Sequence, residues 1–124
     1  PYAQTNDHYL DPGAFVQTVA AGKNSAIYRA HSYHTKVPHE GIERYLNHYT
    51  NPGDLVLDPF CGSGTALIAA EITKRRCFGI EIDPGYADIS IRRWIDFTGE
   101  MPVHAVTGKT FKETRDQRER EGNI

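Results

Sequence analysis

The segment that most constrains the fold of this 124-residue chain is Asp58–Thr65, which reads DPFCGSGT. It follows the short apolar run Leu55–Leu57 and precedes a stretch rich in Ala, Leu and Ile, from Gly64 to about Thr73. The run is typical of a parallel strand buried on both faces, and the stretch is typical of a helix. Glycines at the turn let a ligand approach the backbone, and free N–H groups at the helix start favour an anionic group. The sequence therefore predicts a ligand site at this turn.

A second strand, predicted over Cys77–Ile82, completes one βαβ unit. Asp58 and Glu81 are 23 positions apart, close to the roughly 20 that separate the glycine turn from the ribose-binding carboxylate in dinucleotide folds. The two strand ends are therefore expected to meet one nucleoside. The full GxGxxG spacing is not met, because Leu67 stands at the sixth position from Gly62. A nicotinamide or flavin cofactor is accordingly disfavoured.

Three motifs resemble, in order and spacing, those of DNA methyltransferases that modify adenine N6 or cytosine N4. Tyr33–Leu46 (YHTKVPHEGIERYL) resembles the segment that precedes their glycine motif, and DPFCGSGT is similar to their S-adenosylmethionine-binding motif. Gly79–Tyr86 (GIEIDPGY) looks like their acidic second-strand motif, so the likeness covers about Tyr33 to Arg93. It implies an α/β, Rossmann-like methyltransferase fold, present here in part, with S-adenosyl-L-methionine as the cofactor.

The resemblance also implies which residues hold that cofactor. Glu81 suits the ribose diol, and Asp58 is placed to stabilise the ammonium directly or through water. Hydroxyl groups of Ser63, Thr65 and Thr35 can donate to the carboxylate, while two apolar residues pack against the cofactor. The predicted cofactor-binding residues are Thr35, Lys36, Asp58, Pro59, Phe60, Cys61, Gly62, Ser63, Gly64, Thr65, Glu81 and Ile82, with Phe60 and Ile82 as the packing pair.

No catalytic residue can be assigned from the sequence. Enzymes of this type use Asp, Asn or Ser followed by Pro-Pro and an aromatic residue to accept hydrogen bonds from the target amino group, and no such segment occurs here. Asp83-Pro84 is expected to cap a helix instead. The chain is therefore expected to be the cofactor-binding half of a DNA methyltransferase, inactive alone, that meets DNA through a missing segment or a partner chain. Homo- and hetero-oligomers both stay open.

Composition and length limit the expected partners, cellular location and domain organisation of the chain. The chain has 14 basic and 16 acidic side chains, so it carries no overall basic field that would attract nucleic acid. Two cysteines, Cys61 and Cys77, are too few for a disulfide scaffold. Neither a membrane span nor a signal peptide is found, so a cytoplasmic location is expected. The length fits one incomplete domain, 1–124, with 1–32 and 107–124 peripheral.

Other interpretations compete with this one. DPFCGSGT also resembles guanine-N2 RNA methyltransferases, although His34–Pro38 (HTKVP) favours DNA, and a non-catalytic S-adenosylmethionine-binding module is a third alternative. His31-x-x-His34 has the spacing of metal ligands, but no carboxylate or cysteine lies nearby in sequence, so no metal is expected. The nucleophilic cysteine of cytosine-C5 enzymes follows a proline, whereas Cys61 follows Phe60 and is interpreted as a packing residue.

The remaining elements follow from local signals. Ile42, Tyr45, Leu46 and Tyr49 have the spacing of one buried helical stripe, and Arg93 and Trp94 are expected on the inner side of a later helix. Helices are predicted over Pro12 to about Ala21, Pro38 to about His48, Pro84 to about Phe97, and after a capping box at Thr110–Glu113, with short strands near Ile27-Tyr28 and over Val103–Val106. The last helix is almost entirely charged and is interpreted as a solvated face.

Overall fold

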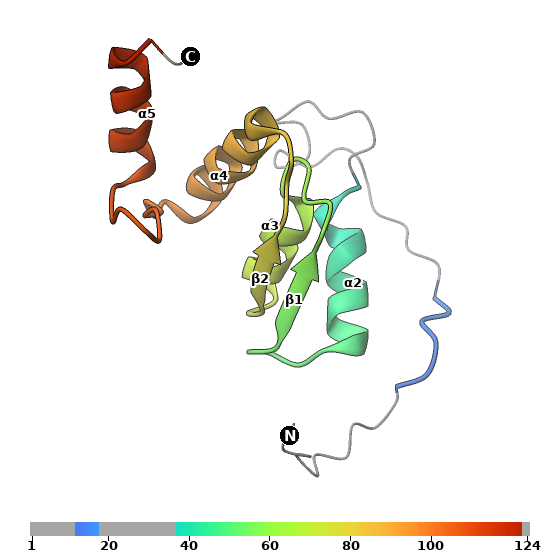
Figure 1. Cartoon of the computed structure of the whole chain (residues 1–124). Helices are drawn as coiled ribbons and strands as arrows, with labels where there is room; N and C mark the ends of the chain where they lie inside the picture. The colour runs from blue at the N-terminus through green and yellow to red at the C-terminus, as the bar shows by residue number, and fades with distance from the viewer. Residues whose placement is uncertain (1–11, 18–36, 123–124) are drawn as a thin grey trace, which may run out of the picture.

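The computed structural model describes residues 12–17 and 37–122 (Figure 1). Strands β1 (Leu55–Asp58) and β2 (Arg76–Gly79) form a parallel two-stranded sheet in which Leu55 pairs with Arg76 and Asp58 with Gly79. The helices are α2 (His39–Tyr49), α3 (Thr65–Ile72), α4 (Pro84–Thr98) and α5 (Phe111–Arg120). The order β1–α3–β2 is a βαβ unit, which confirms the predicted α/β class and its partial Rossmann-like arrangement.

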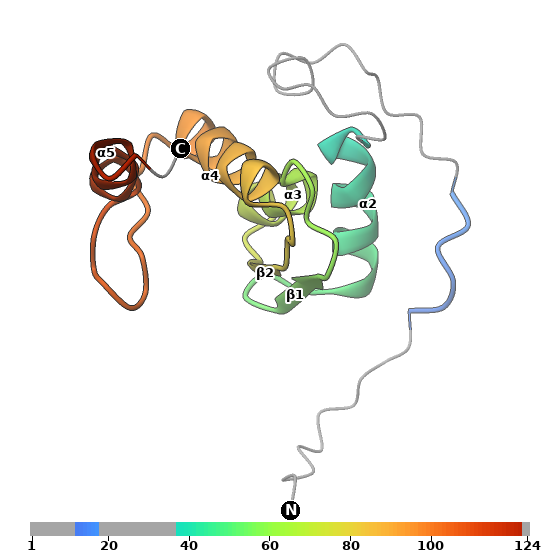
Figure 2. The same cartoon turned by 45° about the horizontal axis from the view of Figure 1, so that its top comes forward.

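One face of the sheet is covered by α2 and α3 (Figures 1 and 2). Leu46 of α2 and Ala69 and Ala70 of α3 form the buried core, against which Val56 and Cys77 of the strands pack. The opposite face is bare in the described part of the chain: its side chains are more than half exposed, at Leu55 57%, Leu57 65%, Phe78 60% and Ile80 58%. The prediction that the first strand is buried on both faces is therefore wrong here, because the two described helices that cover the sheet, α2 and α3, lie on the same side (Figure 2).

The apolar residues of α2 divide between two neighbours. Leu46 faces the core, whereas Tyr45 is 46% exposed and its ring lies 4.7 Å from that of Phe15. Tyr49 is 38% exposed, and its hydroxyl accepts a hydrogen bond of 2.8 Å from the Phe15 N–H. The prediction of one buried stripe, with both tyrosines in the core, is therefore wrong.

The predicted N-terminal helix is wrong over residues 12–17, which are not helical. Gly13 has a φ of +73°, in the left-handed region. The Phe15 N–H donates to Tyr49 and the Gly13 carbonyl lies 2.9 Å from Nε2 of His48, so contacts with α2 replace helical hydrogen bonds. The rest of that helix and the strand near Ile27-Tyr28 lie outside the described residues.

Arg75 closes the C-terminal end of α2. It is 9% exposed and donates to the Thr50 carbonyl at 2.7 Å, the Thr50 hydroxyl at 3.0 Å and Oδ1 of Asn47 at 3.1 Å. A cation at a helix C-terminus is stabilised by the negative end of the helix dipole. This arginine, which lies in a charged turn of the sequence, is thus part of the fold.

Local signals place both ends of α4 and the start of α5 correctly. The Asp83 carboxylate accepts from the Gly85 N–H at 2.7 Å to cap α4, and Gly99, with φ +74°, ends it. Thr110 and Glu113 form the predicted capping box of α5. The predicted strand over Val103–Val106 is wrong, because this segment turns back on itself and only Val103 forms an isolated bridge, with Thr110. Across the described ranges, no helix has the length and apolar character to cross a membrane.

Candidate functional site

The glycine-rich loop joins the carboxyl end of β1 to α3, as the sequence predicts. The Asp58 carboxylate accepts from the Phe60 N–H at 3.1 Å, which begins the turn. The Cys61 N–H then donates to the Ile80 carbonyl at 3.0 Å, and the Gly64 N–H to the Cys61 carbonyl at 2.9 Å. The loop is therefore fixed both internally and to the segment that follows β2.

Glu81 links the loop to the next turn. One of its carboxylate oxygens accepts from the Gly62 N–H at 2.7 Å, and the other from the Asp83 N–H at 2.9 Å. Hydrogen bonds to an ionised carboxylate are stronger than neutral ones. Asp58 is the last residue of β1, and Glu81 lies two residues beyond the end of β2, which stops at Gly79 rather than at the predicted Ile82. Both carboxylates therefore lie at the carboxyl edge of the sheet, which is where α/β folds place their ligands.

Helix α4 packs behind the loop and holds it from that side. Ser90 donates its hydroxyl to the Gly62 carbonyl at 2.7 Å. Arg93 donates to Oγ1 of Thr65 at 3.0 Å and to the Ser63 carbonyl at 3.2 Å. Gly64 has a φ of +79°, and a Cβ placed there would lie 3.0 Å from Cβ of Ser90. A glycine is therefore required at this point by both conformation and space.

The predicted cofactor-binding residues divide into an open and a buried group. Phe60 is 87% and Ile82 97% exposed, so two apolar side chains stand free near the carboxylates. Ser63 is only 2% exposed and faces α4. Thr65 is partly buried, Pro59 is exposed, and Gly62 and Gly64 are buried. Thr35 and Lys36 lie outside the described residues.

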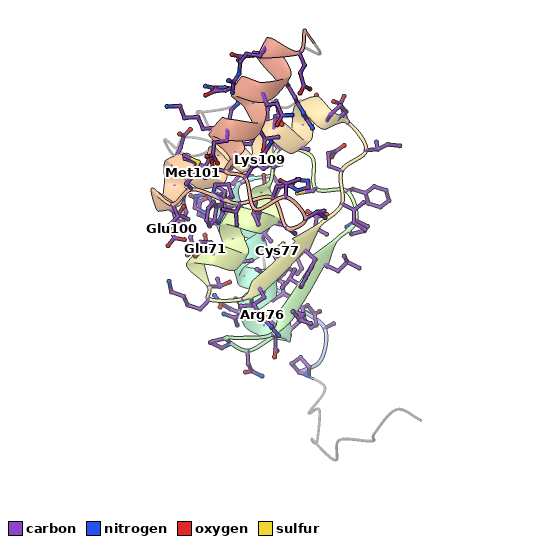
Figure 3. The ribbon with its side chains drawn as sticks, turned by 60° about the vertical axis from the view of Figure 1, so that its left-hand side comes forward. Glu71, Arg76, Cys77, Glu100, Met101 and Lys109 are labelled. Atoms are coloured by element: carbon purple, nitrogen blue, oxygen red, sulfur yellow. The ribbon has the colours of Figure 1, made fainter. Side chains whose placement is uncertain are left out.

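Both cysteine thiols are protonated at neutral pH. Burial raises the pKa of Cys61, an effect partly opposed by a hydrogen bond with Ser90. Burial likewise raises the pKa of Cys77, on β2 (Figure 3), to about 11. A thiol is a good nucleophile only as the thiolate. Cys61 instead packs on Gly79, where a Cβ would lie 2.7 Å from its sulfur.

The possible metal ligands among residues 12–17 and 37–122 are the His, Cys, Asp and Glu side chains. There, no group of three or more His, Cys, Asp or Glu side chains is placed to hold a metal ion. His31 and His34, whose spacing is that of metal ligands, lie outside these ranges.

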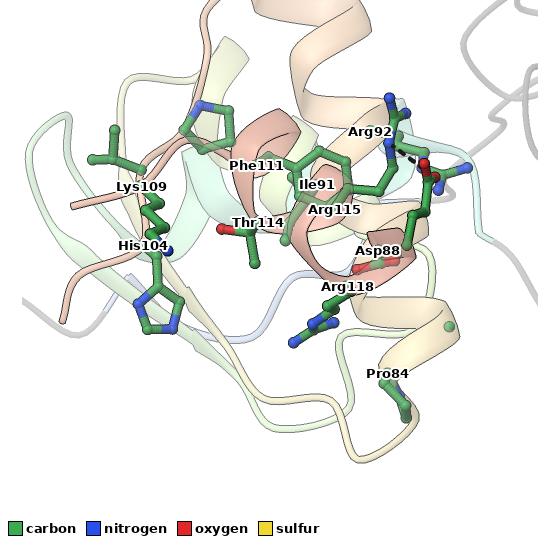
Figure 4. Close-up of a pocket in the computed structure, with 14 residues that line it drawn as sticks. Pro84, Asp88, Ile91, Arg92, His104, Lys109, Phe111, Thr114, Arg115 and Arg118 are labelled. Carbon is green, nitrogen blue, oxygen red and sulfur yellow. Dashed lines mark ion pairs between the residues drawn. The ribbon is translucent and has the colours of Figure 1, made fainter. Parts of the chain in front are cut away.

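A groove of about 400 Å³ lies between α4, the turn before α5, and α5 itself (Figure 4). Its apolar floor includes Ile91 and Phe111, and the Arg92 guanidinium lies 5.9 Å from the Phe111 ring centre. Arginine and lysine side chains in the lining outnumber the acidic pair Asp88 and Glu119; they are Arg92, Lys109, Arg115 and Arg118, of which Arg115 forms an ion pair with Glu119 at 3.6 Å. Sequence reasoning missed this groove, because the mixed charges of α5 gave no sign that its basic residues converge with those of α4.

Comparisons with known proteins identify the family of the chain. A family model described as DNA methylase, of the N6 and N4 type, matches residues 6–92. Type II methyltransferase M.Cfr9I of Citrobacter freundii is 45% identical over 56 residues, which are 45% of this chain and 19% of that protein. DNA adenine methyltransferase YhdJ of Escherichia coli (strain K12) is 41% identical over 59 residues, 48% of this chain and 20% of that protein.

Among solved structures, the complex of M1.HpyAVI with SAM is 37% identical, with a TM-score of 0.47, over 48% of this chain and 29% of that one. The chain spans about a fifth of the length of the curated relatives it matches. The family match covers most of the chain, including the glycine loop, Glu81 and the start of α4. The chain belongs to the N6/N4 DNA methylase family.

Proposed function

We propose that this chain binds S-adenosyl-L-methionine at the glycine loop and Glu81. In the proposal it is the cofactor-binding part of an enzyme that transfers a methyl group to an exocyclic amino group of adenine or cytosine in DNA. The observation that carries the proposal is the pairing of Glu81 with the Gly62 N–H at 2.7 Å, in a chain of this family. That bond joins a carboxylate to a glycine loop at the carboxyl ends of parallel strands.

The residues present fit the chemistry of this cofactor. An ionised carboxylate has about four acceptor positions, and Glu81 uses two for backbone N–H groups, which leaves acceptors for a ribose diol. The exposed side chains of Phe60 and Ile82 offer apolar surface to a flat adenine ring. Asp58 supplies a negative charge for the ammonium, and Thr65 a hydroxyl for the carboxylate. Thr35 and Lys36 stay proposed contacts on the resemblance alone.

The proposed methyl transfer does not use a cysteine as a nucleophile. The bound cofactor supplies an activated methyl group, and the residues of this chain bind and orient it, which accelerates transfer through proximity and alignment. A DNA base must leave the stack to reach such a site. The neutral thiols of Cys61 and Cys77 are consistent with direct transfer without a covalent enzyme intermediate.

We also propose that catalysis needs a further segment or a partner chain in addition to these 124 residues. The sequence holds no Asp-Pro-Pro-aromatic type of motif to accept the target amino group. The sheet face with Leu57 and Phe78, which are 65% and 60% exposed, has no cover among residues 12–17 and 37–122. It is apolar surface of the kind that other segments cover. A cytoplasmic location belongs to the same proposal.

For DNA itself, the groove between α4 and α5 is the surface we propose for phosphate contacts. Arg92 and Arg118 reach it from two helices, and Lys109 from the turn between them, whereas Arg115 is paired with Asp116 and Glu119. Arginine and lysine neutralise phosphates without reading sequence. The groove includes Pro84 and Gly85 at the start of α4, only a few residues beyond Glu81, so bound DNA would lie near the cofactor loop.

Transfer of a labelled methyl group tests the reaction. The full chain would be incubated with labelled S-adenosyl-L-methionine and either unmodified genomic DNA or RNA, with and without a segment supplying the missing motif. Label in DNA only when that segment is present is the expected result. Label in RNA alone would overturn the DNA assignment in favour of a guanine-N2 RNA methyltransferase. Cofactor binding without transfer to either would favour a non-catalytic module.

A further inference from the structure

Arg93 carries a buried positive charge under the glycine loop. Its side chain is 2% exposed, and one terminal nitrogen, Nη1, donates hydrogen bonds to Ser63 and Thr65. Nε and Nη2 are also buried and have no hydrogen-bond partner among the described residues. Burial lowers the pKa of the Arg93 guanidinium, but arginine stays charged in proteins. The loop is therefore backed by a cation with unused donors.

Among the described residues no acidic side chain pairs with this cation, so its position there is electrostatically unfavourable. Thr65, which Arg93 contacts, is the first residue of α3, and the N-terminal end of a helix is its positive end. Arg75 shows the opposite case: it sits at the C-terminal end of α2, and its guanidinium donates to acceptors of Asn47, Thr50 and Thr73. Buried charges without a counter-charge are costly. An anion near Thr65 would remove that cost.

We propose that Arg93 is a positioning residue for the carboxylate of the cofactor's methionine portion. The inference rests on the proposed binding of S-adenosyl-L-methionine. It assigns a role to a residue on α4, outside the glycine loop and the turn that holds Glu81 and Asp83. Two effects act together. The charge of Arg93 attracts the carboxylate across the loop, and its Nη1–H, by donating to Oγ1 of Thr65, leaves the single hydroxyl proton of Thr65 free to donate to the ligand.

The sharpest test compares two ligands that differ by one group. S-adenosyl-L-methionine and its decarboxylated form share the adenosine, sulfonium and ammonium groups, and only the first has the carboxylate. Calorimetric Kd values would be measured for the wild-type chain, Arg93→Met and Arg93→Lys. We expect Arg93→Met to weaken binding of S-adenosyl-L-methionine by about tenfold, as for the loss of a charge interaction at moderate effective dielectric. Binding of the decarboxylated ligand should weaken by less than about threefold. Arg93→Lys keeps the charge, so its Kd for S-adenosyl-L-methionine should lie between those of the wild-type chain and Arg93→Met.

A matched control is Arg76→Met, which removes an arginine at the start of β2, the end of the strand opposite the loop (Figure 3). It should leave both Kd values unchanged. Equal loss for the two ligands in Arg93→Met would overturn the proposal and leave Arg93 a purely structural role. Unchanged affinity for S-adenosyl-L-methionine would overturn it as well. If the wild-type chain bound neither ligand, the proposed function itself would fail.

Thr65→Val keeps the test decisive if Arg93→Met does not fold. Valine matches threonine in shape and removes only the hydroxyl that Arg93 orients. We expect weaker binding of S-adenosyl-L-methionine and little change for the decarboxylated ligand. Where both single variants fold, the double variant should lose less than the sum of the two, since the charge and the hydroxyl act on one carboxylate. Strict additivity would contradict the coupling.

Discussion

The backbone N–H of Gly62 donates to the carboxylate of Glu81 across 2.7 Å, although the two residues are 19 positions apart. The same carboxylate accepts from the Asp83 N–H at 2.9 Å. Glu81 therefore connects two turns through hydrogen bonds, and it is also the proposed acceptor for a ribose. Any substitution of Glu81 acts on the loop and on the ligand together, so tests of its binding role must separate the two.

Replacing Gly64 with alanine should destabilise the chain more than the same change at Gly99. Both glycines have φ in the left-handed region, +79° and +74°, but only at Gly64 would a Cβ meet another side chain, Ser90, at 3.0 Å. Backbone strain alone costs about 1 kcal/mol at such a site, and crowding adds about 1 to 2 kcal/mol more. The free energy of unfolding in urea measures both variants. Equal losses for Gly64→Ala and Gly99→Ala would show that α4 does not press on the loop.

Stability should fall as the pH rises from about 9 to 11. The pKa of Cys77 is raised by burial from 9.0 to about 11, so in that window the unfolded chain loses a proton that the folded chain keeps. Unfolding is then favoured as pH increases. Urea midpoints at pH 8, 9 and 10 would show this decline. Cys77→Ala, which removes the thiol, should flatten it relative to the wild-type chain, and an identical slope in the variant would assign the decline to other groups.

Local sequence signals correctly predicted the helix ends that depend on residues close together in the sequence. The caps at Asp83 and Thr110 and the stop at Gly99 are confirmed, because a cap is formed by residues two or three positions apart. The glycine loop and its closeness to Glu81 were also predictable, since the two strands of a βαβ unit end at the same edge.

Relationships between distant segments were harder to predict. Helical periodicity placed Arg93 on the inner side of α4, but not its contact with Thr65, 28 positions away. The run Leu55–Leu57 indicated burial, yet an apolar run does not say how many layers cover a sheet. In the part of the chain that the structure describes, one face has no covering layer. Residues 12–17 have helix-start signals that are overridden by contacts with Tyr45 and Tyr49.

Neutralising the groove should weaken DNA binding in a salt-dependent way. Removing one phosphate contact should reduce the slope of log K against log salt by about 0.9, so Arg92→Gln with Arg118→Gln should lower it by about 1 to 2. Binding of a labelled duplex to the full chain at several salt concentrations measures this slope. Arg44→Gln, an exposed arginine on α2 outside the groove, is the control. The same reduction in Arg44→Gln would indicate a general charge effect rather than contacts in the groove.

Glu81 and the glycine loop are proposed to hold the adenosine portion of S-adenosyl-L-methionine, and the rest of the proposed function depends on this contact. The decisive measurement is calorimetry with S-adenosyl-L-homocysteine and its 2′,3′-dideoxy analogue, which lacks both hydroxyls of the ribose diol, on the wild-type chain and Glu81→Gln. Glutamine removes the charge and keeps one acceptor oxygen, so it retains a bond from the Gly62 N–H or from the Asp83 N–H but not both. We expect Glu81→Gln to weaken binding of the parent ligand by about tenfold, equivalent to the loss of a charge-assisted hydrogen bond of about 1.4 kcal/mol, and the analogue to bind both proteins almost equally. The same loss for both ligands, or unchanged affinity in Glu81→Gln, would contradict the proposed role of Glu81.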